Sequence, residues 1–382
     1  MIIILFIRKP VASRSIVETS KSEHYRGERF PVHRNFSEAG SIGGRHSMST
    51  SDGPLIEIRP AGLYCPAGDF YVDPIEAVPY AVISHGHADH ARPGHQHYLA
   101  SSLCAPILKA RLGTAIDVQS LAYGEPVLRN GVRLSLHPAG HILGSAQVRI
   151  EHAGRVWVVT GDFKQHADPT CLPFEPVRCH GLIMESTFGL PVFRWPAPGQ
   201  VLNQINQWWA HNRREQQPSL LFAYSLGKAQ RILSGIEAIG PIYLHGAVAA
   251  VNQVYARAGI VLPAALPVGA KSEPHEFSGA LIVAPPIADH SVWTRRFKKA
   301  ERAYASGWMQ IRGNRRRRSL DRGFVLSDHA DWDGLLAAVS ASQAEEVWVT
   351  HGFDSELVRY LNERGCRAKT FTLPYPGETD ED

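Results

Sequence analysis

Cysteines are few in this chain, and none is arranged for disulfide or thiolate chemistry. The five among its 382 residues are Cys65, Cys104, Cys171, Cys179 and Cys366. They are scattered, odd in number and never spaced as Cys-x-x-Cys, which argues against both a disulfide framework and a thiolate zinc site. A reducing compartment is the simplest setting for such a chain, and we therefore expect it to be cytoplasmic.

Long hydrophobic runs are also missing. The apolar stretch at residues 1–6 is too short to cross a membrane, and basic residues follow it where a signal peptide would have them in front. We therefore expect no membrane association. The next stretch is polar, rich in Ser, Arg and His, and without periodicity, so we predict that residues 1–53 form a disordered extension. Translation from Met48 is an alternative to Met1.

Positive charge is in only slight excess, but it is unevenly distributed along the chain. The net charge is +4, yet between Arg295 and Arg322 eleven Lys or Arg residues stand against two acids. The densest run is Arg315, Arg316, Arg317 and Arg318, and the interleaved aromatic residues are Trp293, Phe297, Tyr304 and Trp308. Such a segment favours a groove that binds phosphates and stacks bases over its alternative, a solvated basic loop.

Against these absences stands a dense cluster of metal-binding residue types. Residues 85–90 read His-Gly-His-Ala-Asp-His and directly follow a short apolar run that we predict to be a buried strand. We expect a helix to begin there, so that the side chains converge without burying unpaired polar groups. His85 and His87 can bind one cation, and Asp89 and His90 a second. Neutral imidazole and carboxylate groups are ligands typical of zinc.

Three further candidate ligands each follow a strand-like segment. They are His141, Asp162 and His351, and each has a glycine beside it. Taken singly, each would be interpreted as an ordinary core, surface or turn residue. Functional side chains are nevertheless common where strands end. Together with residues 85–90, they predict a metal centre.

The order of these residues resembles the signature of the metallo-β-lactamase superfamily, which begins with an acidic residue at the end of an early strand. Asp73 occupies that position. The resemblance implies two zinc ions, with manganese as an alternative; their ligands would be His85, His87 and His141 for one, and Asp89, His90 and His351 for the other. Asp162 would bridge the two ions. Asp73 would accept a hydrogen bond that orients a ligand, or would merely be a turn residue before Pro74.

Additional motifs are similar to those of the β-CASP branch of this superfamily, which processes nucleic acids. Glu185, in Met-Glu-Ser-Thr-Phe-Gly, matches the first acidic marker, and His329, in Ser-Asp-His-Ala-Asp, the second; His351 serves as the third. The resemblance implies that His329 donates a proton to the leaving oxygen or holds the scissile phosphate. Glu185 would orient His329. We predict that Asp331, in contrast, is the N-cap of a helix that begins at residue 332.

Candidate substrate-binding residues follow from the same resemblance. Ser186 lies next to the first marker. Lys228 belongs to residues 224–230, a segment similar to one that recurs in the inserted domain of the family. We expect Lys228 to contact a phosphate, with an exposed helix lysine as the alternative. The arginine run 315–318 completes this set.

Several stretches are similar to the bacterial ligase-associated DNA exonucleases, namely residues 90–95, 185–189, 306–309 and 326–332. This resemblance implies a two-metal phosphodiesterase that acts as a DNA exonuclease in DNA repair, with a metal-bridging hydroxide as the nucleophile. It also implies association with an ATP-dependent DNA ligase and a helicase. Because a histidine at position 351 is typical of RNA-processing β-CASP enzymes, a ribonuclease is the main alternative. A small-molecule metallo-hydrolase or a silent nucleic-acid-binding module are the alternatives of other classes.

The arrangement of strand and helix signals predicts an insertion. Residues 54–190 and 324–382 alternate short apolar runs with helical runs, whereas residues 191–323 carry signals of their own at 219–223, 230–238, 242–245 and 281–284. No repeat with a period of roughly 20–50 residues is present, which excludes a solenoid. The resemblance implies an α/β fold, a metallo-β-lactamase αββα sandwich in two parts with residues 191–323 as an inserted β-CASP cap.

Overall fold

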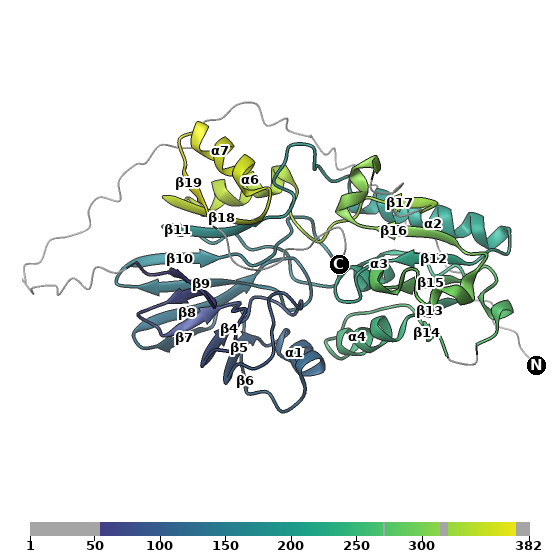
Figure 1. Cartoon of the computed structure of the whole chain (residues 1–382), viewed down its shortest axis with the longest axis horizontal. Coiled ribbons are helices and arrows are strands. Elements are labelled where there is room, and N and C mark those ends of the chain that lie inside the picture. The colour runs from purple at the N-terminus through teal and green to yellow at the C-terminus, as the bar shows by residue number, and fades with distance from the viewer. Residues whose placement is uncertain (1–53, 270–271, 314–319, 372–382) are drawn as a thin grey trace, which may run out of the picture. The chain divides into compact units, whose positions relative to one another are not determined.

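The polypeptide folds around three β-sheets, which the computed structural model of the chain shows in Figure 1. The structure describes residues 54–269, 272–313 and 320–371. The predicted extension, residues 1–53, and the arginine run 315–318 lie outside these described residues. Among the helices that the structure describes, none combines the length and the apolar composition needed to cross a bilayer.

The first sheet contains six strands in chain order. Its first three strands pair antiparallel, and from the third strand onward all neighbours are parallel. The strands are β1 (Glu57–Arg59), β2 (Gly62–Cys65), β3 (Phe70–Val72), β4 (Tyr80–Val82), β5 (His97–Ser101) and β6 (Val118–Leu121). Helix α1 (Ala105–Leu112) connects β5 to β6, and its Leu108 packs with Ala81 and Ile83 on one face of this sheet.

The second sheet contains seven strands and combines two distant parts of the chain. Its order is β19-β18-β11-β10-β9-β8-β7, antiparallel from β7 to β10 and parallel from β10 to β19. The strands are β7 (Pro126–Arg129), β8 (Val132–Pro138), β9 (Ala146–His152), β10 (Arg155–Val159), β11 (Gly181–Ser186), β18 (Glu346–Gly352) and β19 (Arg367–Thr370). Helices α6 (Trp332–Ser342) and α7 (Asp354–Glu363) pack against β11 and β18.

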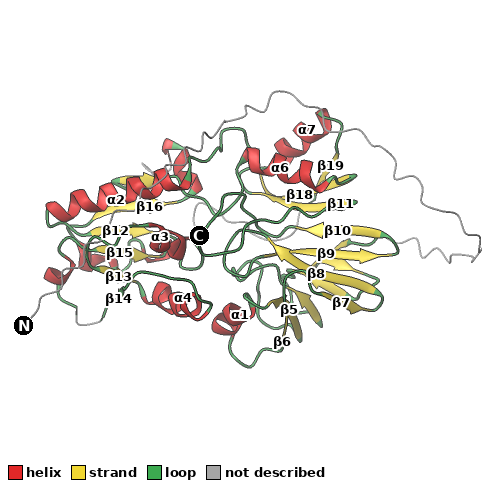
Figure 2. Ribbon diagram, turned by 180° about the vertical axis from the view of Figure 1, so that it is seen from behind, coloured by secondary structure: helices red, strands yellow, loops and turns green. Residues whose placement is uncertain are grey.

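One hydrophobic core joins these two sheets. Along β8, Leu134 and Leu136 are fully buried while Arg133 between the apolar positions is exposed, as the alternation of a half-buried strand requires. Leu63, Val72 and Val82 of the first sheet belong to the same core. With α1 on one outer face and α6 and α7 on the other, the order of layers is helix, sheet, sheet, helix (Figure 2).

The third sheet is entirely parallel and lies between β11 and β18 in the sequence. Its order is β14-β13-β15-β12-β16-β17. The strands are β12 (Ser219–Phe222), β13 (Ile242–Leu244), β14 (Leu266–Pro267), β15 (Leu281–Ala284), β16 (Glu301–Ala305) and β17 (Arg322–Phe324). The central strands are apolar at nearly every position, because both faces of this sheet are covered.

Helices cover one face of the third sheet and short 3-10 turns cover the other. The helices are α2 (Pro198–Arg214), α3 (Lys228–Gly235) and α4 (Gly246–Arg257), with Ile205, Ile232 and Val248 in the core beneath them (Figures 1 and 2). The opposite face packs against η1 (Pro274–Phe277), η2 (Pro286–Ala288), η3 (Thr294–Phe297) and η4 (Gly307–Gln310).

The predicted elements of the insertion are largely confirmed. The strand signals at 219–223, 242–245 and 281–284 correspond to β12, β13 and β15, and the helix signal at 230–238 corresponds to α3, which begins two residues earlier. The predicted N-cap is also confirmed, since the Asp331 side chain accepts a hydrogen bond from Gly334 N at the start of α6. The predicted boundary after residue 323 falls inside β17, which ends at Phe324.

Candidate metal centre

The motif at residues 85–90 lies in the loop that follows β4. Beyond the strand, Ile83 N still donates to Leu99 O at 2.8 Å. The helix that we predicted here does not form, and the segment makes turns with a single helical-type hydrogen bond, from Ala91 N to His87 O at 2.9 Å. Pro93 explains the difference, because proline lacks an N–H donor and disfavours the helical conformation of the residue before it. The histidines therefore project from a loop at a strand end.

The other candidate ligands come from three segments of the second sheet. His141 lies between β8 and β9, Asp162 follows β10, and His351 is the penultimate residue of β18. Gly161 has φ of +55°, and a Cβ there would lie 2.6 Å from the Ser84 side chain. Only glycine fits this position without a shift, so the backbone can bring Asp162 against the 85–90 loop.

The first ligand group consists of His85, His87, His141 and Asp162, whose ligand atoms all lie within 4.8 Å of one another. His87 Nδ1 is 3.1 Å from both His85 Nε2 and His141 Nε2. Asp162 Oδ2 is 3.4 Å from His85 Nε2 and 3.8 Å from His141 Nε2. Ligand atoms about 2.0–2.1 Å from a tetrahedral zinc ion would be roughly 3.3 Å apart. The donor set and its spacing therefore fit such an ion.

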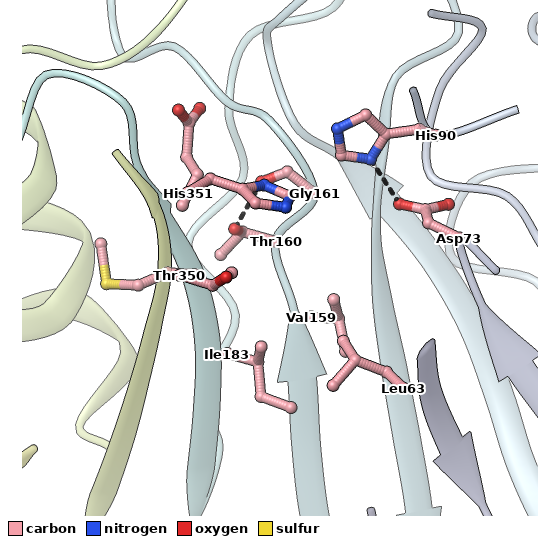
Figure 3. Close-up of a pocket in the computed structure, with 11 residues that line it drawn as sticks. Leu63, Asp73, His90, Val159, Thr160, Gly161, Ile183, Thr350 and His351 are labelled. Carbon is pink, nitrogen blue, oxygen red and sulfur yellow. Dashed lines mark hydrogen bonds and ion pairs between the residues drawn. The ribbon is translucent and has the colours of Figure 1, made fainter. Parts of the chain in front are cut away.

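The second ligand group consists of His90, His351 and again Asp162. Asp162 Oδ2 lies 3.4 Å from His90 Nε2, so one carboxylate belongs to both groups. Asp89 is more peripheral, since its Oδ2 is 3.6 Å from His90 Nε2 and its side chain is 26% exposed. A cavity of about 30 Å³, lined in part by His90 and His351, lies beside this group (Figure 3).

Hydrogen bonds to the outer nitrogens set the tautomers of the clustered histidines. Nδ1–H of His85 donates to Ser84 Oγ at 3.0 Å, and Nδ1–H of His141 donates to Asp328 O at 2.7 Å. His87 is reversed, because its Nε2–H donates to Leu226 O at 3.0 Å. In each ring the nitrogen that faces the group is then left with a lone pair, the state in which imidazole binds a metal.

Asp73 orients the second group. Its Oδ2 accepts the Nδ1–H of His90 at 2.8 Å, and Figure 3 shows the two side chains directed at each other. The same carboxylate accepts Ser84 N at 2.7 Å and Ser84 Oγ at 2.5 Å. The hydrogen bond predicted for Asp73 is therefore present. It holds His90 with Nε2 directed at Asp162.

The electrostatics of the cluster favour positive charge at its centre. Burial lowers the pKa of His85 and of His141 well below the usual range, and it lowers that of His351 to about 4. For His90, burial is outweighed by the carboxylates of Asp162 and Asp89, which raise its pKa well above the usual range. Burial would raise the pKa of Asp162, but His90 and His85 hold it well below its usual range. The carboxylates that favour the charged form of His90 would stabilise a metal cation bound beside them in the same way.

Glu185 and His329 form a buried pair beside the first group. His329 Nδ1 donates to Glu185 Oε2 at 2.8 Å, and both side chains are 2% exposed. Glu185 is held in turn by Phe163 N at 2.8 Å and by the Thr187 hydroxyl at 2.5 Å. The His329 ring lies 4.7 Å from that of His141, between centroids. The orienting contact predicted for Glu185 is therefore present.

Three relatives are similar in sequence to this chain, over regions of different length. The chain is 34% identical to a probable DNA ligase of Opitutus terrae. The matched region is 310 residues long and covers 80% of this chain and 30% of the relative. The chain is 32% identical to cleavage and polyadenylation specificity factor subunit 3 of Dictyostelium discoideum. That match is 120 residues long and covers 30% of this chain and 15% of the relative. The chain is 29% identical to an RNase J-like protein of Methanocaldococcus jannaschii. That match is 143 residues long and covers 35% of this chain and 34% of the relative.

The family follows from these relatives together with the ordered ligands and markers. The chain belongs to the β-CASP branch of the metallo-β-lactamase superfamily. It spans about a third or less of the length of these three relatives. No protein-family model matches the chain. A crystal structure of a protein of unknown function from Enterococcus faecalis V583 shares the fold, with a TM-score of 0.52 at 12% identity over 78% of this chain and 80% of that one.

Two residues predicted to contact substrate, Ser186 and Lys228, are buried in this structure. Ser186 is fully buried, and its hydroxyl donates to Thr350 O at 3.2 Å and to His351 O at 3.0 Å. It therefore ties β11 to the strand that carries His351. Lys228 is 3% exposed, which excludes the exposed helix lysine, and its Nζ lies 3.8 Å from Asp328 Oδ2. Neither side chain is open to solvent.

The basic segment is exposed only in part. Arg295 in η3 and the two lysines that follow it, Lys298 and Lys299, are exposed. Arg296, in contrast, donates to Gly269 O and Ser272 O, and Arg302 pairs with Asp289. Of the four interleaved aromatic residues, Phe297 and Tyr304 are buried in the core of the third sheet and Trp293 packs against that core. Trp308 also packs against that core, and its ring contacts that of Phe188, which lies 6.1 Å from the ring of His329.

The sequence interpretation missed the residues that support the ligands. Ser84 and the carbonyls of Leu226 and Asp328 orient three histidines. A backbone carbonyl leaves no signal in residue identity, and Leu226 comes from the segment between β12 and α3, 139 residues from its partner. Ser84 acts through its side chain and directly precedes His85, so it was the one of these three supports that its place beside the motif could have revealed.

Proposed function

We propose that this chain is a two-metal phosphodiesterase that shortens DNA from its ends in DNA repair. The observation that carries the proposal is the Glu185–His329 pair beside two ligand groups that share Asp162. A metal centre with an adjacent, carboxylate-oriented histidine supplies both the electrophilic and the proton-donating requirements of phosphodiester hydrolysis. The third sheet with its helices would be the β-CASP cap, residues 191–323.

The ligand groups would hold two metal ions. His85, His87 and His141 would bind the first, His90, His351 and Asp89 the second, with Asp162 between them. Bound divalent ions activate water at neutral pH and neutralise charge that grows on a transferring phosphoryl group. We propose zinc, because most of the ligands are imidazoles, with manganese as the alternative.

His329 would protonate the departing sugar oxygen. Its Nδ1 donates to Glu185, so His329 would pass its proton to the substrate from Nε2. The carboxylate stabilises the imidazolium form and fixes the ring, as an orienting acid does for a catalytic histidine. Burial raises the pKa of Glu185, and the positive charge of His329 only partly offsets this effect.

The preference for DNA is supported by the extent of similarity. The relative that covers 80% of this chain is a probable DNA ligase, whereas the two RNA-related proteins above cover 30% and 35%. The same similarity favours association with an ATP-dependent DNA ligase, and the family resemblance favours a helicase. RNA processing is the second candidate, because position 351 carries the histidine typical of those enzymes.

The deciding experiment uses matched end-labelled single-stranded DNA and RNA. Purified, zinc-loaded protein should shorten the DNA stepwise, and the His87→Ala variant should not. Preferential cutting of the RNA would replace the DNA proposal with the ribonuclease. No cutting of either substrate by protein with two bound zinc equivalents would favour a small-molecule hydrolase, and absence of bound metal would favour a silent binding module.

A further inference from the structure

Five charged side chains are buried together behind the first ligand group. Three are cations and two are carboxylates, and the most exposed of them is 9% accessible. They are Lys164, Asp168, Lys228, Arg231 and Asp328, which we call the buried charge network. The network connects the loop after β10, the first turns of α3 and the segment that precedes α6.

Asp328 is the centre of the network. Arg231 Nη1 donates to its Oδ1 at 2.9 Å and to the neighbouring Ser327 O at 2.6 Å. Lys164 and Lys228 approach its two oxygens, each at 3.8 Å. These three cations hold the pKa of Asp328 far below its usual range against the effect of burial. Both the side chain and the backbone of this segment are thereby fixed.

A second carboxylate completes the connection to the β10 loop. Asp168 Oδ2 lies 2.7 Å from Lys164 Nζ and 3.4 Å from Arg231 Nε. Lys164 Nζ also donates to His141 O at 3.1 Å. One cation of the network therefore contacts the backbone of a ligand of the first group directly.

The network also reaches that ligand group through two carbonyls. Asp328 O accepts the Nδ1–H of His141 at 2.7 Å, and Leu226 O, two residues before Lys228, accepts the Nε2–H of His87 at 3.0 Å. Between them, Gly227 packs so closely that a Cβ would lie 2.2 Å from Ile142 Cγ2. The segments that follow β12 and β17 thus hold two histidines that belong to loops of the other sheets.

Burying five charges is a costly way to stabilise a fold. Removing ions from water carries a desolvation penalty that their attraction only partly offsets, and apolar residues of similar volume often serve as well. An ionic network at this place is better explained by what it fixes. Its contacts end on both sides of His141, on the ring through Asp328 O and on the backbone through Lys164.

We propose that the buried charge network positions the first ligand group, with Arg231 and Asp328 as positioning residues that set the orientation of His141 and His87. The inference rests on the proposed metal centre. Outer partners of metal-binding histidines commonly alter metal affinity by about 10- to 100-fold. Loss of the network should therefore weaken metal binding although no ligand is removed.

The test is a cobalt(II) titration of the full-length, metal-free chain, followed by its visible absorption, which reports the geometry of the bound ion. Asp328→Asn keeps the shape and the backbone carbonyl but removes the charge, and should weaken binding at one site by about 10- to 100-fold with an altered spectrum. Arg231→Lys keeps the charge, but one ammonium group cannot reproduce the guanidinium's contacts with Ser327, Asp328 and Asp168, so it should weaken binding as well.

Asn212→Ala is the matched control. It removes a buried hydrogen bond of 3.0 Å to Ser219 Oγ at the end of α2, and neither residue belongs to a ligand group or to the buried charge network. It should lower the stability of the metal-free chain and leave cobalt affinity unchanged. If the network served only the stability of the fold, all three variants would have lower stability and unchanged cobalt affinity. That result would overturn the inference.

The remaining outcomes also separate the inference from the proposed function. Wild-type binding of two equivalents with unchanged affinity in Asp328→Asn and Arg231→Lys overturns the inference alone. Failure of both variants to fold overturns it too, because the network would then be a folding element. If the wild-type chain binds no cobalt, the metal centre and the proposed function fail together.

Discussion

Asp162 is the residue on which both ligand groups depend. Its Oδ2 lies 3.4 Å from His85 Nε2 and 3.4 Å from His90 Nε2, one histidine of each group. His90 and His85 keep the pKa of Asp162 well below the usual range, against the effect of burial, so the charged form of this carboxylate is favoured. No other described carboxylate occurs in both groups.

Replacing this carboxylate should affect both sites at once. Asp162→Asn removes the shared negative charge, and we expect bound zinc to fall from two equivalents to fewer than one, with nuclease activity reduced by at least about 100-fold. Metal analysis of the purified variant and the labelled-DNA assay measure the two effects. Asp117→Asn, in an exposed pair with His97, is the control and should change neither. Retention of two zinc equivalents would contradict the shared role.

His329 should matter for turnover and not for metal binding. His329→Ala is expected to retain both zinc ions and to lose about 10²- to 10⁴-fold in kcat, the usual contribution of a general acid. Glu185→Gln should behave similarly but more mildly, because the imidazole remains without its orienting carboxylate. Unchanged kcat in His329→Ala, measured with saturating DNA, would remove its proposed role.

His95 makes the metal-free chain sensitive to acid. Burial lowers its pKa to about 4, and its neutral Nδ1 accepts Val78 N at 3.3 Å. Because the unfolded histidine titrates near 6.5, stability is fully present above that pH and is lost as the pH falls from about 6.5 to 4. Between pH 7.5 and 4.5 the wild type should lose roughly 2–3 kcal/mol more than His95→Gln in urea unfolding with chelator present. Equal losses would show that His95 is not responsible.

At the scale of elements, the strand ends were predictable and the connections were not. The apolar runs before His85, Asp162 and His351 correspond to β4, β10 and β18, because a buried strand needs an apolar residue at almost every position. The helix expected over residues 85–90 was wrong, since Pro93 limits it to one turn. Local patterns carry no information about which carbonyl, more than 100 residues away, will accept a histidine N–H.

The end of β18 depends on a glycine. Gly352 has φ of +108°, and a Cβ there would lie 2.4 Å from Ser186 O. Gly352→Ala should therefore shift His351, directly before it, and weaken the second ligand group while the first keeps its ion. A cobalt titration should show one of two sites weakened. Gly113→Ala, also at positive φ but with no atom within 4 Å of the added Cβ, is the control for backbone strain alone.

For the whole molecule, the exposed charges beside η3 should govern affinity for nucleic acid. Arg295, Lys298 and Lys299 are exposed, and phosphate contacts of this kind give binding that weakens steeply with salt. Lys298→Glu combined with Lys299→Glu should weaken binding of single-stranded DNA and flatten its salt dependence, measured by fluorescence anisotropy. Arg359→Glu, on an exposed position of α7, should not. Equal salt slopes for all three proteins would show that this segment is a solvated loop.

The carbonyls that orient His87 and His141 have a thermodynamic consequence for the whole chain. They lie in the segments that follow β12 and β17, the second of which leads on to α6. Attachment of the third sheet and occupancy of the first ligand group are therefore linked equilibria, and each must favour the other by the same factor. A chelator that removes the ion should therefore also weaken the contacts that the Leu226 and Asp328 carbonyls make with the two histidines. Amide hydrogens near the start of α3 should then exchange faster in the presence of the chelator. A nucleic acid that favoured attachment of the third sheet would, by the same reciprocity, raise the affinity of the first ligand group for its ion.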